Sequence, residues 1–338
     1  MIILKIIFTP LLFFIKEKYY YFAFREVRVV FCRSMGGFTD TMASIHRCLQ
    51  YAITNNRMLV IDTSYSGLHD AFAKYFVLQK NLPIRVELEL TEALKQKIFA
   101  LPSTQPFLLH KTTEQKMNYN FGFDNSGLIL GYINPDSKQP TFFDLTKPYD
   151  SQLLIYQNSV GFQDLQEIKS LGVFTWFRVK PTISNQIISR LEHFNGKMYE
   201  SIHVRCTDYF SDYKTFFEKI KPEITSTYLL ICSDRQEVIE YGMQYFTGQI
   251  VLSTNSFSSE DNAPLHDRWA RYSKISKQER FKLNIDLLVD LCALSGASKY
   301  HRIPITKTKG FTPQYSGFSN AAFYLHHNQH ERKNFFGI

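Results

Sequence analysis

The segment from Met198 to Asp208 reads MYESIHVRCTD and sets the fold that the sequence favours. Its first part, residues 198–205, is rich in β-branched and aromatic side chains, a composition typical of a buried strand. Polar residues follow at once. In open α/β sheets, ligands bind beyond the carboxyl ends of the strands. The segment therefore predicts a central strand and one edge of a binding site.

Strand and helix patterns alternate around this segment, an order typical of α/β layering. The middle section, 101–150, gives weak signals and is expected to be irregular. In the second half, the other expected strands are 227–233, 250–253 and 299–303, and the expected helices are 183–194, 235–246, 277–294 and 319–326. In the first half, the expected strands are 27–32, 58–62 and 153–156, and the expected helices are 41–54 and 87–99.

The composition of the 338 residues excludes a disordered chain, because 44% are hydrophobic and 15% aromatic. The length fits two domains. We expect an apolar extension at 1–24, a first domain at 25–175 and a second at 176–338. The formal charge of +8 favours anionic partners without choosing among them. Five scattered cysteines without a C-x-x-C pair indicate reduced thiols in a cytoplasmic protein.

The N-terminal residues are the candidate membrane contact. Residues 1–15 are almost wholly apolar, but Lys5, Thr9 and Pro10 interrupt them, and a spanning helix needs about 20 apolar residues. The lysines and tyrosines that follow resemble an interfacial anchor. The alternatives are an extension packed on the globule or a start site placed too early. Peripheral membrane contact through residues 1–18 therefore stays open.

His203 and Arg205 are the first candidates for a binding role. Their spacing of two places both side chains on one side of the strand. A guanidinium fork suits two phosphate oxygens, and the imidazole can donate beside it. The pair could thus stabilise a departing diphosphate. The alternative is a structural ion pair between Arg205 and Asp208.

Ser233 and Asp234 end the next expected strand. A carboxylate at this position can bind a ribose hydroxyl or the amide edge of a purine. An Asp after a strand is also a common N-cap of the following helix, and capping is the stronger interpretation from these residues alone.

Ser316-Gly317-Phe318-Ser319 forms a small, hydroxyl-rich turn before the last expected helix. A helix N-terminus of this kind offers free amide groups to an anion. The alternative is a plain serine cap.

A glycine turn, Gly36-Gly37, follows the first expected strand. Adjacent glycines let the backbone approach a bound group closely, and the positive end of a helix follows. The turn matches neither G-x-G-x-x-G nor a Walker loop.

These four segments together resemble the fucosyltransferase superfamily of GT-B architecture, which includes the α1,6-, nodulation, α1,2- and protein O-fucosyltransferases. His203 to Asp208 matches the family's His-x-Arg-x-x-Asp segment, Ser233-Asp234 its acidic second motif, and residues 316–319 its serine-rich third motif. The three occur in the family's order. The resemblance runs from about residue 27 to about residue 326, without a matching motif in the middle section.

The resemblance implies two Rossmann-like domains facing across a cleft, with a nucleotide sugar, typically GDP-fucose, on the second domain. It implies that His203 and Arg205 contact the diphosphate, that Asp234 lies near the nucleoside and that Ser319 lies near the phosphates. The glycine turn would close on them from the first domain. The expected donor-binding residues are His203, Arg205, Asp208, Ser233, Asp234, Ser316, Gly317, Phe318, Ser319, Gly36 and Gly37.

Three departures from the family pattern bear on donor and acceptor selection. Arg235 stands where some members have a second acidic residue, and Cys206 replaces a second arginine that is common in the α1,6-enzymes. Both changes bear on the choice of guanine and fucose. Asp40 stands in the glycine turn where relatives often have Asn or Gln.

The expected reaction is an inverting transfer that uses no cofactor and no divalent metal. Positive charge near the diphosphate lowers the barrier to its departure, a role that Arg205 would take, and the sequence has no Asp-x-Asp pair to hold a metal ion. Inversion needs a base for the acceptor hydroxyl. The candidates are Asp40, Asp208, Asp212 and Glu218. We place Arg205, Asp212 and Asp40 in the catalytic set.

Rival functions are a transferase for another nucleotide sugar and a non-enzymatic protein that binds nucleic acid or a membrane surface. The basic residues are dispersed, and no nucleic-acid-binding signature occurs. The expected partners are therefore a nucleotide sugar and a glycan acceptor, not nucleic acid. The histidines of His326-His327-x-x-His330 could hold a metal, but a solvated tail is the favoured interpretation.

Overall fold

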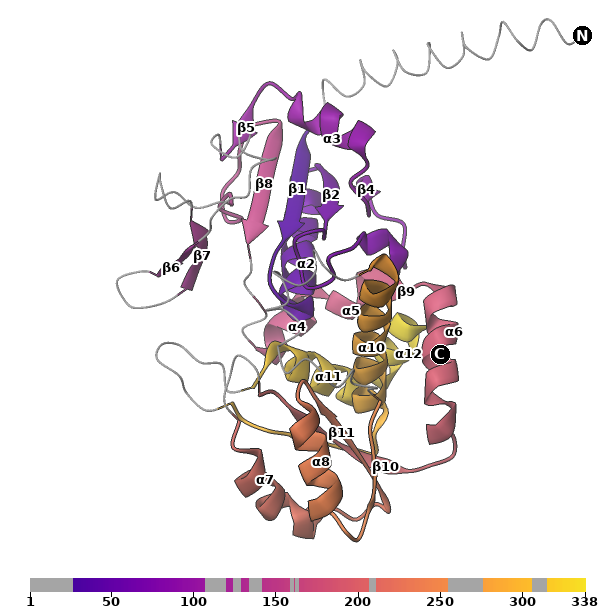
Figure 1. Ribbon diagram of the computed structural model, residues 1–338. Helices are drawn as coiled ribbons and strands as arrows, with labels where there is room; N and C mark the ends of the chain where they lie inside the picture. Colours follow the sequence, from indigo (N-terminus) through magenta and orange to yellow (C-terminus); the bar gives the residue numbers. More distant parts are fainter. Residues whose placement is uncertain are drawn as a thin grey trace, which may run out of the picture.

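The computed structural model describes residues 27–106, 120–123, 129–133, 142–158, 161, 164–206, 211–254, 276–305 and 315–338. In these ranges it contains two parallel β-sheets (Figure 1). The first sheet has the strand order β4-β2-β1-β8-β5. Its strands are β1 (Val29–Ser34), β2 (Met58–Asp62), β4 (Val86–Glu87), β5 (Thr104–Gln105) and β8 (Leu153–Asn158).

The second parallel sheet lies in the C-terminal half and has the order β12-β11-β10-β13. Its central strand β10 (Tyr199–Val204) is buried along its whole length, as a strand covered on both faces should be. The other members are β11 (Tyr228–Ser233), β12 (Ile250–Leu252) and β13 (Lys299–Arg302). Two antiparallel pairs complete the described strands: β3 (Phe76–Leu78) with β9 (Phe177–Val179), and β6 (Asn120–Phe123) with β7 (Ile129–Ile133).

Helices connect the parallel strands and cover the sheets (Figure 1). The described α-helices are α2 (Phe38–Thr54), α3 (Glu92–Phe99), α4 (Leu165–Leu171), α5 (Val173–Trp176), α6 (Pro181–Leu191), α7 (Tyr213–Ile220), α8 (Gln236–Tyr245), α10 (Lys277–Gly296), α11 (Gly317–His327) and α12 (Gln329–Phe336). The 3₁₀ turns are η1 (Phe72–Lys74), η3 (Glu192–Phe194) and η4 (Lys221–Glu223).

One apolar core runs through both halves of the chain, from Val30 on β1 to Leu230 on β11. The last helix, α12, crosses back to the first half, where the buried ring of Phe335 lies 4.9 Å from that of Phe174 and 6.0 Å from that of Phe76. The histidine segment 326–330, for which a solvated tail was the favoured interpretation, lies in α11 and α12: His327 and His330 are exposed, but the segment is helical and not a tail. Burial of rings like Phe335 stabilises the fold by about 1.5–3 kcal/mol each.

The predicted α/β class is confirmed, and the elements that differ have local causes. The helix expected at 87–99 begins only at Glu92, because Thr91 caps it by accepting the amide of Leu94, and Val86–Glu87 pairs with β2. The helix expected from residue 41 begins at Phe38. The proposed domain limits at 25–175 and 176–338 stay predictions.

None of the helices within the described ranges has both the length and the hydropathy that a membrane crossing requires. The proposed membrane contact at residues 1–18 lies outside those ranges.

Candidate functional site

His203 lies at the end of β10, under the first turn of α11. Its side chain is buried, and its ring centroid is 5.2 Å from that of Phe318. Burial lowers the pKa of the imidazole to about 4, although the charge of Asp234 opposes this shift. His203 is therefore neutral at pH 7, and it can offer a ligand a hydrogen bond but no positive charge.

Arg205 pairs with Asp234, which ends the neighbouring strand β11. The Arg205 Nη1 atom lies 3.3 Å from Asp234 Oδ2, and the other carboxylate oxygen accepts the Cys206 amide at 2.9 Å. The Arg205 side chain is 20% exposed and that of Asp234 is 7% exposed. Arg205 thus forms an ion pair with Asp234. Asp208, the partner considered in the sequence analysis, lies outside the described residues. Asp234 holds the guanidinium at the carboxyl edge of the sheet.

The N-cap interpretation of Asp234 is wrong. The capping position of α8 belongs to Arg235, whose amide donates to Ser233 Oγ at 3.2 Å. The carboxylate of Asp234 turns away from that helix and toward β10. Because the residue after a strand can face either its own helix or the adjacent strand, its sequence position alone did not decide the matter.

The serine-rich motif forms the first turn of α11. Ser316 is the N-cap, and its Oγ accepts the amide of Ser319 at 3.1 Å. The buried hydroxyl of Ser319 lies 2.9 Å from that of Tyr300, inside the fold. Amides in the first turn of a helix lack intrahelical acceptors. The motif therefore offers backbone donors and the positive end of α11 rather than the Ser319 hydroxyl.

The glycine turn and the serine-rich motif meet. A Cβ atom added to Gly317 would lie 2.6 Å from Oγ1 of Thr39, in the first turn of α2. Gly36 adopts a φ of +79° that favours glycine, and its carbonyl accepts the amide of Gly67 at 2.6 Å. The structure thus joins two motifs that are far apart in the sequence, at the N-termini of two helices.

The candidate bases differ in their placement. Asp40, in the first turn of α2, accepts the Gly37 amide at 2.8 Å, beside the contact with α11. Asp212 is exposed and caps α7 by accepting the Thr215 amide at 3.3 Å, and Glu218 is exposed on the same helix. Asp40 is thus the candidate that belongs to the turn facing α11.

Arg302 lies beside the candidate site, and the sequence analysis did not single it out. It ends β13 and is the register partner of His203. The guanidinium carbon lies 3.9 Å from the Tyr315 ring centroid and 3.7 Å from that of Phe323. Burial lowers its pKa, but arginine stays protonated at pH 7. The sequence signal that could have pointed to Arg302 is a basic residue near the end of the strand expected at 299–303.

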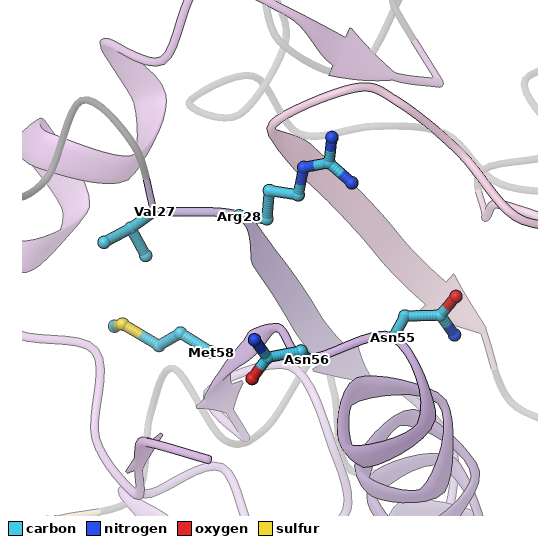
Figure 2. Close-up of a pocket in the computed structure, with 5 residues that line it drawn as sticks. All are labelled: Val27, Arg28, Asn55, Asn56 and Met58. Atoms are coloured by element: carbon cyan, nitrogen blue, oxygen red, sulfur yellow. The ribbon is translucent and has the colours of Figure 1, made fainter.

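Two hollows lie along the first sheet. One of about 430 Å³ surrounds the start of β1, with Val27 and Met58 at its edge (Figure 2). Parallel sheets bind ligands at the opposite edge. A second hollow of about 330 Å³ lies at that edge, beside Arg33 and Asp62, which form a buried ion pair of 2.9 Å. The Tyr65 ring, 36% exposed, also lines it.

A metal centre is not evident within the part of the chain that the structure describes, where no three His, Cys, Asp or Glu residues gather in a suitable group. The cysteines in this part are free, and all but Cys206 are buried.

The two parallel sheets, each joined by helices, have the fold of the GT-B fucosyltransferases. NodZ α-1,6-fucosyltransferase, in a crystal soaked with GDP-fucose, superposes with a TM-score of 0.58 at 16% identity over 89% of this chain and 93% of that one. The fucosyltransferase NodZ from Bradyrhizobium gives 0.58 at 17% identity, over 88% and 93% of the two chains. The predicted resemblance is confirmed for the fold. No protein-family model and no curated protein sequence matches the chain.

Proposed function

We propose that the protein is an inverting, metal-independent glycosyltransferase that moves fucose from GDP-fucose to a glycan hydroxyl. One observation carries the proposal: the end of β10 meets the start of α11, where the ring of His203 lies 5.2 Å from that of Phe318, and the same turn of α11 meets the first turn of α2 at Gly317. Arg205 follows His203 by two residues at this carboxyl edge of the sheet. The fold neighbours support the choice of donor, since NodZ α-1,6-fucosyltransferase was crystallised with GDP and its crystals were soaked with GDP-fucose.

The diphosphate would lie between Arg205 and the amides at the start of α11. A guanidinium can bind two phosphate oxygens at once, and the helix dipole favours negative charge at this end. As the bond between sugar C1 and the phosphate oxygen breaks, its electron pair passes to the diphosphate. Asp234 is the positioning residue in this proposal, because it fixes the guanidinium before the donor arrives.

The acceptor hydroxyl would attack C1 from the opposite face and pass its proton to a carboxylate. Asp40 is the base that the geometry favours, because it extends from the turn that meets α11. The second hollow, which Tyr65 lines in part, is the proposed acceptor side.

A nucleotide panel tests this function. Thermal unfolding is followed with GDP, UDP or ADP, and transfer from GDP-fucose to a mixture of glycans is followed with EDTA present. We expect GDP alone to raise the unfolding temperature and EDTA to leave transfer unchanged. If UDP or ADP raises the unfolding temperature and GDP does not, the assignment of GDP-fucose as the donor is wrong. If EDTA abolishes transfer, the reaction is not metal-independent.

A further inference from the structure

The side chains that carry the proposed donor site supply little net positive charge. His203 is neutral at pH 7 because burial lowers its pKa to about 4. The charge of Arg205 is offset by Asp234, 3.3 Å away. A nucleoside diphosphate carries several negative charges, and burying unpaired charge is costly. A second cation among the described residues near the end of β10 would balance more of this negative charge.

Arg302 stands where that cation would be expected. Its Cα is in register with that of His203 on the adjacent strand, so the two side chains leave the same face of the sheet. This face is the one that α11 covers, because Tyr300, two residues earlier, reaches Ser319 on that helix. Arg302 thus extends toward the first turn of α11.

The residues around Arg302 hold the plane of its guanidinium group and leave N–H donors at the edge of that group. Tyr315 and Phe323 cover the guanidinium at 3.9 and 3.7 Å. In the plane, Nη1 donates to Oδ1 of Asn320, in the first turn of α11, at 3.0 Å. A guanidinium has five N–H donors. Stacking of this kind pre-organises the remaining donors for a bidentate contact with an oxyanion.

The electrostatics of this position point to an anion. The N-terminus of a helix carries a partial positive charge, so a cation held there is unfavourable in the absence of a ligand. Among the residues that the structure describes, no carboxylate pairs with Arg302. By contrast, Lys299 at the other end of β13 is offset by Glu223, 3.4 Å away.

We propose that Arg302 is a second phosphate-binding residue, which grips the diphosphate of the nucleotide sugar together with Arg205 and the N-terminus of α11. The inference rests on the proposed function and adds to it a residue outside the motifs that carry the family resemblance. It also accounts for Cys206, which stands where the α1,6-enzymes commonly have a second arginine after Arg205. Arg302, at the end of β13, would supply that second cation.

The test compares the affinities of GDP, GMP and guanosine by isothermal titration calorimetry for the wild type and for Arg302→Gln. Loss of charged hydrogen bonds predicts about 10- to 100-fold weaker binding of GDP, with the affinity for guanosine unchanged within about twofold. Lys299→Gln, which removes the same charge from the far end of the same strand, should leave all three affinities unchanged. Arg302→Lys keeps the charge and should bind GDP with an intermediate affinity.

The outcomes separate the two proposals. If the wild type binds GDP and Arg302→Gln binds it equally well, the role of Arg302 is refuted while the proposed function stands. If Arg302→Gln and Arg302→Lys weaken guanosine and GDP by the same factor, Arg302 is only structural. If the wild type binds no nucleoside diphosphate, both proposals fail.

Discussion

The ion pair between Arg205 and Asp234 makes a quantitative prediction. Substitution of Arg205 with Ala removes the guanidinium that lies 3.3 Å from the carboxylate of Asp234, a side chain that is 7% exposed. Breaking a buried pair costs about 3–5 kcal/mol, and the 20% exposure of the arginine places the expected loss of unfolding free energy near 2–3 kcal/mol. The double variant Arg205→Ala/Asp234→Ala should recover at least about 1 kcal/mol of the summed single losses, because it removes both partners of this ion pair together.

Urea unfolding of the wild type, both single variants and the double variant measures this coupling, and GDP affinity is measured on the same four proteins. Arg205→Ala and the double variant should both lose GDP binding by about tenfold or more, since neither retains the phosphate contact. Additive stability losses, within about 0.5 kcal/mol, would refute the pairing. A double variant that binds GDP like the wild type would refute the phosphate role of Arg205.

Three further predictions concern other parts of the fold. The pKa of His203 is lowered to about 4 from an unfolded value near 6.5, so the unfolding free energy should be highest above pH 6.5 and about 2 kcal/mol lower at pH 5. Urea unfolding at both pH values checks this, because the His203→Asn variant should not show the decrease. An NMR titration midpoint of His203 near 6.5 would contradict the prediction. Gly317→Ala should weaken GDP binding through its clash with Thr39, and Thr39→Ala should restore part of the affinity; equal GDP titrations of all variants would refute the contact. Phe335→Ala should lower the unfolding free energy by about 3–5 kcal/mol, whereas the exposed control His330→Ala should change it by less than about 0.5 kcal/mol; equal effects would mean that α12 is not part of the core.

The sequence predicted those elements whose pattern is local and strong. The strand of His203 and the helix after residue 276 carry apolar residues at intervals along most of their length, and both lie within two residues of the expected limits. The C-terminal helix was missed because its polar residues dominate the pattern. Only Phe335 and Phe336 are apolar within it before the chain end, and their burial depends on a surface from the first half of the chain.

Site residues were harder to assign than strands, because partners are set by neighbours in space. The motif positions pointed to one edge of the sheet, yet the partner of Arg205 follows another strand, 29 residues along the chain. Arg302 belongs to no motif, and its place beside His203 follows from the register of β10 with β13. That register is decided by the packing of the whole sheet.

A crystal structure of the protein soaked with GDP locates the nucleotide. The account predicts density for the two phosphates within hydrogen-bond distance of Arg205 and of the first-turn amides of α11. A nucleotide bound elsewhere, for example in the hollow at the start of β1 (Figure 2), with the end of β10 unchanged, would contradict it.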